Sequence, residues 1–404
     1  MLLKLLNHLS RKVGTPYQLY HEQTIIDRNK ELVCNFRKHF PNFKQFFSVK
    51  ALPNPVILQI MLDQGCGLDC SSPTELYIAK KLNVPSDKII YTSNFTSEKD
   101  VKMACDHNVI LNLDDISLID FIPKNKIPDT LSFRLNPQTN QNWNKFGMTE
   151  ENILRSYEKM LTRSNEEASE IKFGIHMMNN SCELDIAKWE ISVRSMMETI
   201  NRIQNKLDIQ FEFVNIGGGI GIPYRPNEKE ISICQLSSTI ANLFKEYKID
   251  SNLYTENGRY ITGPAGYLVS KCESIKVTNG KTIYGLDASM AHLMRPGMYG
   301  AYHRIIVPRK EKMNHSPASV VGTLCENNDW FAKDRELPVS KIGDLFVICD
   351  TGAHAHSMGF NYNGKLKAPE ILITKENGMK VIRKRETIKS HFDNCCDIDI
   401  FVRD

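Results

Sequence analysis

The sequence predicts an α/β protein, a (β/α)8 barrel followed by an antiparallel β domain. In the first two-thirds of the chain, short β-branched or aromatic runs alternate with longer helical patterns, which is typical of parallel β–α–β units. Eight strands can be placed there, and eight is the number that closes such a barrel. An open doubly wound sheet gives a similar alternation, so the count favours the barrel. After about Tyr260 helical periodicity largely disappears, and Gly, Pro and Asn split the expected strands.

The residue patterns place the individual elements. The expected barrel strands are 46–50, 67–70, 89–93, 109–113, 131–136, 171–178, 211–216 and 253–256. Helical patterns occupy 55–64, 74–82, 151–161, 187–207 and 236–247. Strands of the second domain are expected at 281–286, 302–307, 344–349 and 370–374. We therefore expect a TIM-barrel domain at 25–275 and a β-sandwich or β-barrel domain at 276–404. Residues 1–24 are expected to join this second domain.

The composition excludes several classes of protein. The chain has 404 residues, 41% of them hydrophobic and 24% charged, with 51 Lys and Arg against 47 Asp and Glu. This composition rules out a disordered or collagen-like chain. The net charge of +4 is too small to indicate a nucleic acid partner or an acidic membrane surface. No run approaches the roughly 18 apolar residues that a membrane span needs.

The cysteines and the first residues indicate a cytoplasmic protein with free thiols. The 11 cysteines are scattered, with no CxxC pair and no Cys/His cluster at zinc spacing, so we expect no metal site. Residues 1–13 contain leucines interrupted by charged and amide side chains. A secretory signal has an unbroken apolar stretch instead. These residues are therefore expected to form a first short helix.

A lysine stands at the end of the first expected strand. Lys50 follows a largely apolar run, and Pro53 and Pro55 break the chain before the next helix. Residues at the C-terminal ends of barrel strands face the active site. Desolvation there would penalise the ammonium form and leave an amine able to form a Schiff base. The alternative is a lysine whose ammonium group reaches solvent from the strand end.

Two further segments follow the seventh and eighth expected strands. Gly217, Gly218 and Gly219 carry no side chains, so their N–H groups can approach an anion such as phosphate. A tight turn is the alternative. Glu256 and Arg259 lie three residues apart, and they can either pair with each other or reach a ring nitrogen and an anion.

The order of these segments resembles one family, the fold-type III pyridoxal-phosphate decarboxylases, and within it the diaminopimelate decarboxylases. The resemblance covers most of the chain, from about Gly14 to Asn363. It rests on Ser-Val-Lys-Ala at 48–51, Gly-Leu-Asp-Cys-Ser-Ser at 67–72, Lys-Phe-Gly-Met at 145–148, the triple glycine, Arg-Pro at 295–296, Tyr-Gly-Ala-Tyr-His at 299–303, Leu-Cys-Glu at 324–326 and Asn-Tyr-Asn at 361–363. It implies pyridoxal phosphate as the cofactor.

The resemblance also implies roles for residues around that cofactor. Lys50 would hold it through the lysine amine, and Glu256 would pair with the pyridine nitrogen. The ring could then withdraw electrons from the carbanion that remains when carbon dioxide departs. The implied cofactor-binding set is Lys50, Asp69, Ser181, Gly217, Gly218, Gly219, Glu256, Gly258, Arg259 and Tyr362.

For the substrate, the resemblance implies a pocket that spans a homodimer. Cys325 would act in the partner subunit's site and assist protonation of the carbanion. Arginine suits bidentate recognition of a distal carboxylate, and Glu326 would take the distal ammonium. The implied reaction is meso-diaminopimelate to L-lysine and carbon dioxide, with a substrate set of Arg259, Arg295, Tyr299, Glu326 and Tyr362.

Some residues depart from the family pattern. The family has His-x-His-x-Gly-Ser after the sixth strand, whereas here Met178 replaces the second histidine, which stacks on the cofactor ring, and Asn180 replaces the glycine. Asn257 replaces a proline and His354 a tyrosine. Methionine can cover a ring face but cannot carry protons. The alternatives are a decarboxylase of a related carboxylated amine, from carboxynorspermidine or secondary metabolism, and a non-catalytic homologue.

Overall fold

The chain divides into two compact units in the computed structural model, which describes residues 2–137, 145–167, 170–308 and 314–395. One unit is Thr24–Gly263. The other combines Met1–Gln23 with Pro264–Asp404. In the part of the chain that is described, no helix is both long and apolar enough to cross a membrane.

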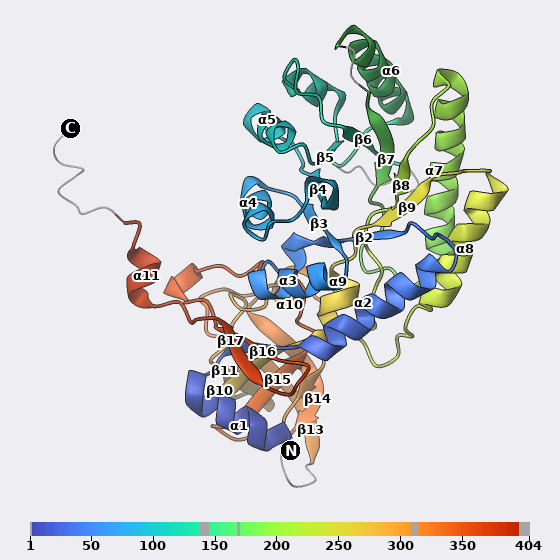
Figure 1. The fold of residues 1–404 in the computed structure, drawn as a ribbon. Coiled ribbons are helices and arrows are strands. Elements are labelled where there is room, and N and C mark those ends of the chain that lie inside the picture. The colour runs from blue at the N-terminus through green and yellow to red at the C-terminus, as the bar shows by residue number, and fades with distance from the viewer. Residues whose placement is uncertain (1, 138–144, 168–169, 309–313, 396–404) are drawn as a thin grey trace, which may run out of the picture. The chain divides into compact units, whose positions relative to one another are not determined.

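The unit Thr24–Gly263 contains a closed barrel of eight parallel strands within its described residues (Figure 1). This confirms the fold expected from the strand count. The ring closes where β2 pairs with β9, with Lys44 opposite Tyr254 and Gln45 opposite Thr255. The strands are β2 (Lys44–Ser48), β3 (Gly67–Cys70), β4 (Ile89–Thr92), β5 (Ile110–Leu113), β6 (Thr130–Leu135), β7 (Lys172–Met177), β8 (Phe213–Asn215) and β9 (Asn252–Thr255).

Helices on the outside of the ring connect most of these strands (Figure 1). Several begin at a polar side chain that accepts a hydrogen bond from the first turn, such as Asn54 before α3 and Ser72 before α4. Such caps satisfy N–H groups that a helix start leaves unpaired. The helices are α2 (Glu22–Arg37), α3 (Pro55–Asp63), α4 (Pro73–Lys81), α5 (Glu98–Asp106), α6 (Glu150–Glu167), α7 (Ile186–Leu207), α8 (Ile233–Glu246) and α9 (Arg259–Thr262).

Large side chains fill the inside of the barrel. A buried cluster joins residues of five strands, namely Phe46, Ile90, Ile110, Phe213 and Tyr254. The rings of Phe213 and Tyr254 stack with centroids 4.4 Å apart. Interior layers of this kind make such a barrel a packed core rather than a pore.

The second unit forms a nine-stranded mixed sheet among its described residues. Most neighbouring strands are antiparallel, as expected, but β1 pairs with β16 and β11 with β13 in parallel. β10 (Gly266–Thr278) spans residue 275, where the domain boundary is expected. Its whole length belongs to this sheet, since it pairs with β1, β11 and β15. The strands are β1 (Tyr17–His21), β10 (Gly266–Thr278), β11 (Lys281–Leu286), β12 (Ile305–Ile306), β13 (His315–Val321), β14 (Trp330–Pro338), β15 (Leu345–Cys349), β16 (Glu370–Ile373) and β17 (Met379–Arg383).

Segments from both ends of the sequence belong to this second unit. The expected first helix is α1 (Leu2–Val13), and its Leu6 and Leu9 pack in a buried cluster with Tyr17 and Ile371. The short helices α10 (Arg295–Tyr299) and α11 (Ile388–Phe392) complete it. The N-terminal residues are therefore part of the core of this unit.

The packing inside the barrel predicts a stability effect at Gly174. A Cβ atom on Gly174 would lie 2.1 Å from the Phe213 ring, so Gly174→Ala should lower the free energy of unfolding by about 1–3 kcal/mol. Urea unfolding of the single variants and of Gly174→Ala/Phe213→Leu tests the cause. The smaller leucine leaves room for the methyl group, so the cost of Gly174→Ala should fall in that background. Equal costs in both backgrounds would contradict the prediction.

Candidate active site

A cavity of about 720 Å³ opens at the C-terminal ends of the barrel strands. Its wall is formed by strand ends and by the turns that follow them. The lining side chains include Lys50, Ser71, Arg134, His176, Met178 and Glu256. A second hollow, of about 830 Å³, lies at the opposite mouth, next to the N-terminal ends of β7, β8 and β9. Catalytic side chains in this fold gather at the C-terminal end, so the first cavity is the candidate site.

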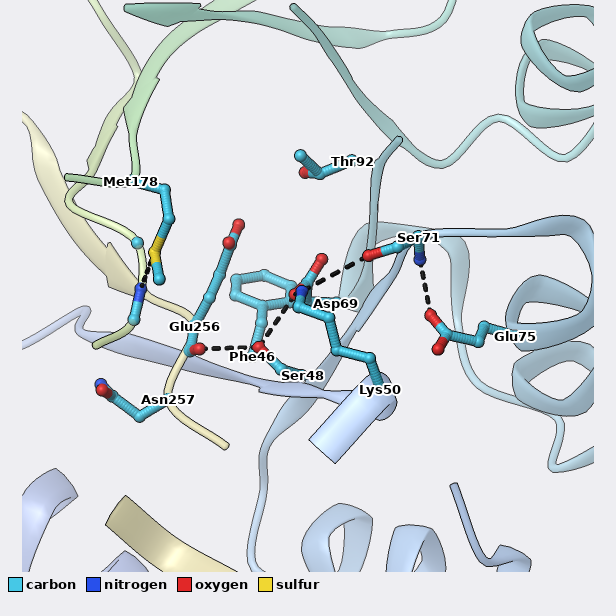
Figure 2. A network of polar contacts seen from close by, with 12 residues as sticks. Phe46, Ser48, Lys50, Asp69, Ser71, Glu75, Thr92, Met178, Glu256 and Asn257 are labelled. Carbon is cyan, nitrogen blue, oxygen red and sulfur yellow. Dashed lines mark hydrogen bonds and ion pairs between the residues drawn. The ribbon is translucent and has the colours of Figure 1, made fainter. Parts of the chain in front are cut away.

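Lys50 lies in the 3-10 turn Val49–Ala51 immediately after β2, not on the strand itself. Its ammonium group is 2.7 Å from Oδ2 of Asp69 and 3.4 Å from Oγ of Ser71 (Figure 2). About half of the Lys50 side chain is exposed, whereas the Asp69 side chain is fully buried. The lysine side chain therefore reaches the cavity, and its ammonium group forms an ion pair with a carboxylate in the cavity wall.

This ion pair corrects the expectation that desolvation would favour the neutral amine. Burial lowers the pKa of Lys50, but the negative charges of Asp69 and Glu256 outweigh it, so the pKa is raised above its ordinary value. The sequence pattern placed the lysine at the end of an apolar strand, but about half of its side chain is exposed. The pattern did not reveal the two carboxylates that the fold brings to the lysine.

Asp69, at the end of β3, is held from two sides. Its Oδ2 atom accepts from Lys50 and lies 2.9 Å from Oγ of Ser48. Its Oδ1 atom is buried without a hydrogen-bond partner among the described residues. Burial raises the pKa of Asp69, the positive charge of Lys50 opposes this, and the net pKa is raised.

Glu256 follows β9 and is also buried. Its Oε1 atom accepts from Nδ2 of Asn215 at 2.7 Å, and Oε2 lies 3.2 Å from Nε2 of His176. Burial raises the pKa of this carboxyl, but His176, Lys50 and the Asn215 hydrogen bond outweigh it and lower the pKa. Glu256 is therefore held as an anion in the cavity wall. Its side chain does not pair with Arg259, which instead donates from Nη1 to the hydroxyl of Tyr224 at 3.0 Å.

The three consecutive glycines allow close contact between loops. Gly217 has a φ of +71°, and its Cβ atom would lie 2.5 Å from the main-chain oxygen of Met177. A Cβ on Gly218 would lie 2.3 Å from the oxygen of Glu256, and one on Gly219 2.2 Å from that of Asn180. The loops after β7, β8 and β9 could not pack in this way around larger residues. This close packing accounts for the glycines without any ligand, so their contact with phosphate stays a proposal.

Two of the four family departures, Met178 and Asn180, lie beside these glycines. The N–H of Gly218 donates to the sulfur of Met178 at 3.2 Å (Figure 2). Nδ2 of Asn180 is buried without a partner in the described part of the chain. Ser181 is exposed at the cavity wall, and Gly258 is buried beside Ala51, whose side chain a Cβ on Gly258 would meet at 2.6 Å.

The remaining expected site residues belong to the second unit. Cys325 and Tyr362 lie together there, with the tyrosine hydroxyl 3.4 Å from the main-chain oxygen of Cys325. Oε1 of Glu326 accepts from the N–H of Asn328. Arg295 and Tyr299 stand at the two ends of α10. The arginine is buried and the tyrosine is exposed.

The structure also adds residues that the sequence reasoning did not single out. His176 and Asn215 hold Glu256, Ser48 contacts Asp69, and the buried Arg134 lines the cavity. Burial lowers the pKa of Arg134. Each of these residues is polar and lies in or at the end of an apolar barrel strand, which is the signal that could have identified them.

The lowered pKa of Glu256 predicts that the protein loses part of its stability in acid. A carboxyl whose pKa is lower in the folded than in the unfolded state stabilises the fold above its unfolded pKa, and this stabilisation is lost as pH falls through the folded pKa. Glu256→Gln should therefore lose less stability than the native protein between about pH 5 and pH 3. Urea unfolding across that range measures the difference. Glu98→Gln, which changes an exposed carboxylate, is the control, and parallel curves for all three proteins would contradict the prediction.

The residues of the cavity fit pyridoxal phosphate. The cavity offers an amine at Lys50, a buried anion at Glu256 for a protonated ring nitrogen, and space between them and Arg134. Beside the lining residue Met178, the N–H of Gly218 donates to that thioether, which is a weak acceptor that a phosphate oxygen would replace. The donor set therefore matches an anionic ligand with a carbonyl and a basic ring nitrogen.

Comparison with known proteins identifies the family. The profile of the family described as "Pyridoxal-dependent decarboxylase, pyridoxal binding domain" matches residues 27–263. Protein TabA of Pseudomonas amygdali pv. tabaci is 38% identical over 96% of this chain and 93% of its own length. The diaminopimelate decarboxylase of Methanothermobacter thermautotrophicus is 33% identical over 94% of this chain and 91% of its own.

Solved structures agree with these relatives. Diaminopimelate decarboxylase from M. jannaschii, in complex with L-lysine, superposes with a TM-score of 0.89 and 31% identity, covering 97% of this chain and 94% of that one. The chain therefore belongs to the pyridoxal-dependent decarboxylases of the diaminopimelate decarboxylase family, and its cofactor is pyridoxal phosphate.

Proposed function

We propose that this decarboxylase converts meso-diaminopimelate to L-lysine and carbon dioxide. The observation that carries the proposal is the buried guanidinium of Arg295, whose Nη1 atom is fixed 2.8 Å from Nε2 of His303. A fixed guanidinium suits the distal carboxylate of diaminopimelate, and the carboxylate of Glu326 suits its distal ammonium. The decarboxylases of M. jannaschii and Helicobacter pylori have been solved with L-lysine bound, which supports a lysine-sized product here.

The barrel residues are proposed to hold and polarise the cofactor. Bound pyridoxal phosphate supplies an electron sink for the carbanion left by decarboxylation. Lys50 holds it through Nζ, with Asp69 beside that atom. Glu256, kept ionised by His176 and Asn215, holds a proton on the ring nitrogen.

The loops around Gly217–Gly219 are proposed to bind the phosphate. The N–H of Gly218, which now contacts the Met178 sulfur, would donate to a phosphate oxygen, and the Arg259 guanidinium would add a positive charge. Met178 covers one face of the ring with its side chain. Ser181 and Gly258 complete the proposed phosphate and ring contacts of the barrel, and Tyr362 of the partner subunit is proposed to add to them.

The second unit is proposed to complete the site of a partner subunit in a homodimer. In this arrangement Cys325 delivers the proton on its sulfur to the substrate carbon after carbon dioxide leaves. Arg295, Tyr299 and Glu326 bind the distal end of the substrate. The exposed positions of Cys325, Tyr299 and Tyr362 support a surface that meets another subunit.

A second candidate is the decarboxylation of another carboxylated amine, such as carboxynorspermidine. The observation that favours it is the pair of substitutions Met178 and Asn180 next to the cavity. These residues remove a titratable side chain and add an amide where the family has histidine and glycine. A changed wall of this kind suits a changed substrate.

Purified protein with added pyridoxal phosphate should form lysine from meso-diaminopimelate, and Lys50→Ala should form none. The lysine amine is needed to hold the cofactor, so this variant should also lose the visible absorbance of the bound cofactor. Lys102→Ala, which changes an exposed lysine, is the control. Native absorbance without lysine formation would overturn the substrate and leave the cofactor proposal intact, and carboxynorspermidine would then be tested.

Substitution of Arg295 should weaken substrate binding more than it slows turnover. Arg295→Met removes a charge-assisted pair with the distal carboxylate, so the KM for meso-diaminopimelate should rise about 10- to 100-fold. Tyr299→Phe removes one hydroxyl and should raise KM less. Steady-state kinetics on both variants measures this, with cofactor absorbance as the check on folding. An unchanged KM for Arg295→Met would remove this residue from the substrate site.

A further inference from the structure

The proton on Lys50 poses a problem for the site. On the proposed function, on which this inference rests, Lys50 must present a neutral amine to the cofactor carbonyl, because an ammonium group has no electron pair to donate. The ion pair with Asp69 works against this, since it favours the charged amine. The proton therefore needs an acceptor within reach of Nζ, and Oδ2 of Asp69 lies 2.7 Å away.

The hydroxyl of Ser48 has two oxygen neighbours and only one proton. Oγ lies 2.8 Å from the main-chain oxygen of Glu256 and 2.9 Å from Oδ2 of Asp69 (Figure 2). A carbonyl oxygen can only accept, whereas a carboxyl group donates when it is protonated. Both short contacts are satisfied together when Ser48 donates to the carbonyl and Asp69 donates to Ser48. With Asp69 ionised, only one of them can be a hydrogen bond.

The surroundings of Asp69 favour this protonated form. The side chain is fully buried, and Glu256 and Glu75 add negative charge. The adjacent thiol of Cys70, whose pKa is raised by burial, is neutral and adds no charge. The opposing positive charges are those of Lys50 and, farther off, Arg134. A carboxylate without access to solvent costs more than the neutral acid, and Asp69 is fully buried whereas Lys50 is half exposed. Proton transfer within the pair leaves its net charge unchanged.

We propose that Asp69 is the base that deprotonates Lys50 and that Ser48 stabilises the protonated carboxyl group. The N–H bond of the ammonium breaks, its electron pair stays on Nζ, and an O–H bond forms at Oδ2. The hydroxyl of Ser48 retains its own proton and donates it in a hydrogen bond to the Glu256 carbonyl oxygen. A lone pair on Oγ accepts the hydrogen bond from protonated Asp69. When the lysine amine is released from the cofactor, the same proton returns to it.

Ser48 can be a hydrogen-bond donor to Asp69 or an acceptor from it, and Ser48→Ala changes the rate of cofactor capture in opposite directions in the two cases. If Ser48 only donated to an ionised Asp69, Ser48→Ala would destabilise that anion, favour the neutral pair and leave cofactor capture as fast as before or faster. If Ser48 accepts from the protonated carboxyl, Ser48→Ala destabilises the acid form and slows capture. The direction of the change therefore separates the two roles.

The test measures the rate at which cofactor-free protein captures pyridoxal phosphate, followed by absorbance from pH 6 to pH 11, because the pKa of the Lys50 ammonium is raised above its ordinary value. Borohydride reduction and mass spectrometry confirm that the cofactor is attached at Lys50. For Ser48→Ala we expect capture about tenfold slower at neutral pH, the effect of one hydrogen bond to the acid form, with the native rate regained in base, where hydroxide removes the proton. Ser48→Thr keeps the hydroxyl and should restore the native profile.

Ser71→Ala is the matched control. It also removes a hydroxyl that contacts Lys50 Nζ, at 3.4 Å, but that hydroxyl does not join Asp69 to a carbonyl. Its capture profile should stay nearer to that of the native protein than that of Ser48→Ala does. Thermal unfolding of each variant shows whether a slow rate reflects loss of structure.

The outcomes separate this inference from the function on which it rests. Native capture at Lys50, with Ser48→Ala as fast as the native protein at every pH, would overturn the proton transfer and leave the function standing. A slow Ser48→Ala profile with no recovery in base, and no rescue by Ser48→Thr, would also overturn it. No capture at Lys50 by the native protein would overturn the proposed function instead.

Discussion

The pairing of β2 with β9 is the constraint on which the site depends. These strands are the first and last of the barrel, and their register places Gln45 opposite Thr255. Buried side-chain contacts secure this closure. Thr255 donates to Oε1 of Gln45 at 2.6 Å, and Nε2 of Gln45 donates to the main-chain oxygen of Asn257 at 2.9 Å. As a result, Lys50 and Glu256, from opposite ends of the barrel sequence, line one cavity.

Once these groups share a cavity, they determine one another's charge. Burial by itself disfavours every ionised form. The negative charges of Asp69 and Glu256 nevertheless raise the pKa of Lys50, and His176, Lys50 and Asn215 lower the pKa of Glu256. Asp69 is the exception, because its pKa is raised despite the adjacent lysine. The cavity therefore contains one firm anion for the ring nitrogen and one carboxyl that can exchange a proton with the amine.

Much of the architecture could be predicted from local patterns. Apolar strands alternate with helices, so the barrel and its order of strands could be predicted from the sequence. The glycines and prolines after Tyr260 mark the change from an α/β pattern to a β pattern. The parallel β1–β16 pair was not predictable in this way, because it joins residues near both ends of the sequence. β13 contains Pro317, which weakens the appearance of a strand. His176 and Asn215 could have been noticed as polar residues within apolar strands, but their contact with Glu256 could not, because it joins three different strands in space.

The sequence by itself determined the residue types and their order: a lysine after the first strand, glycines after the seventh and a glutamate after the eighth. These are properties of short segments, where period, turn residues and motif spacing act locally. Only the tertiary structure decided which charges meet. The contacts of Lys50 with Asp69, of Ser48 with two oxygens and of Glu256 with His176 all link different strands. Hydrogen bonds and charge interactions depend on distance in space, and closing the barrel sets those distances.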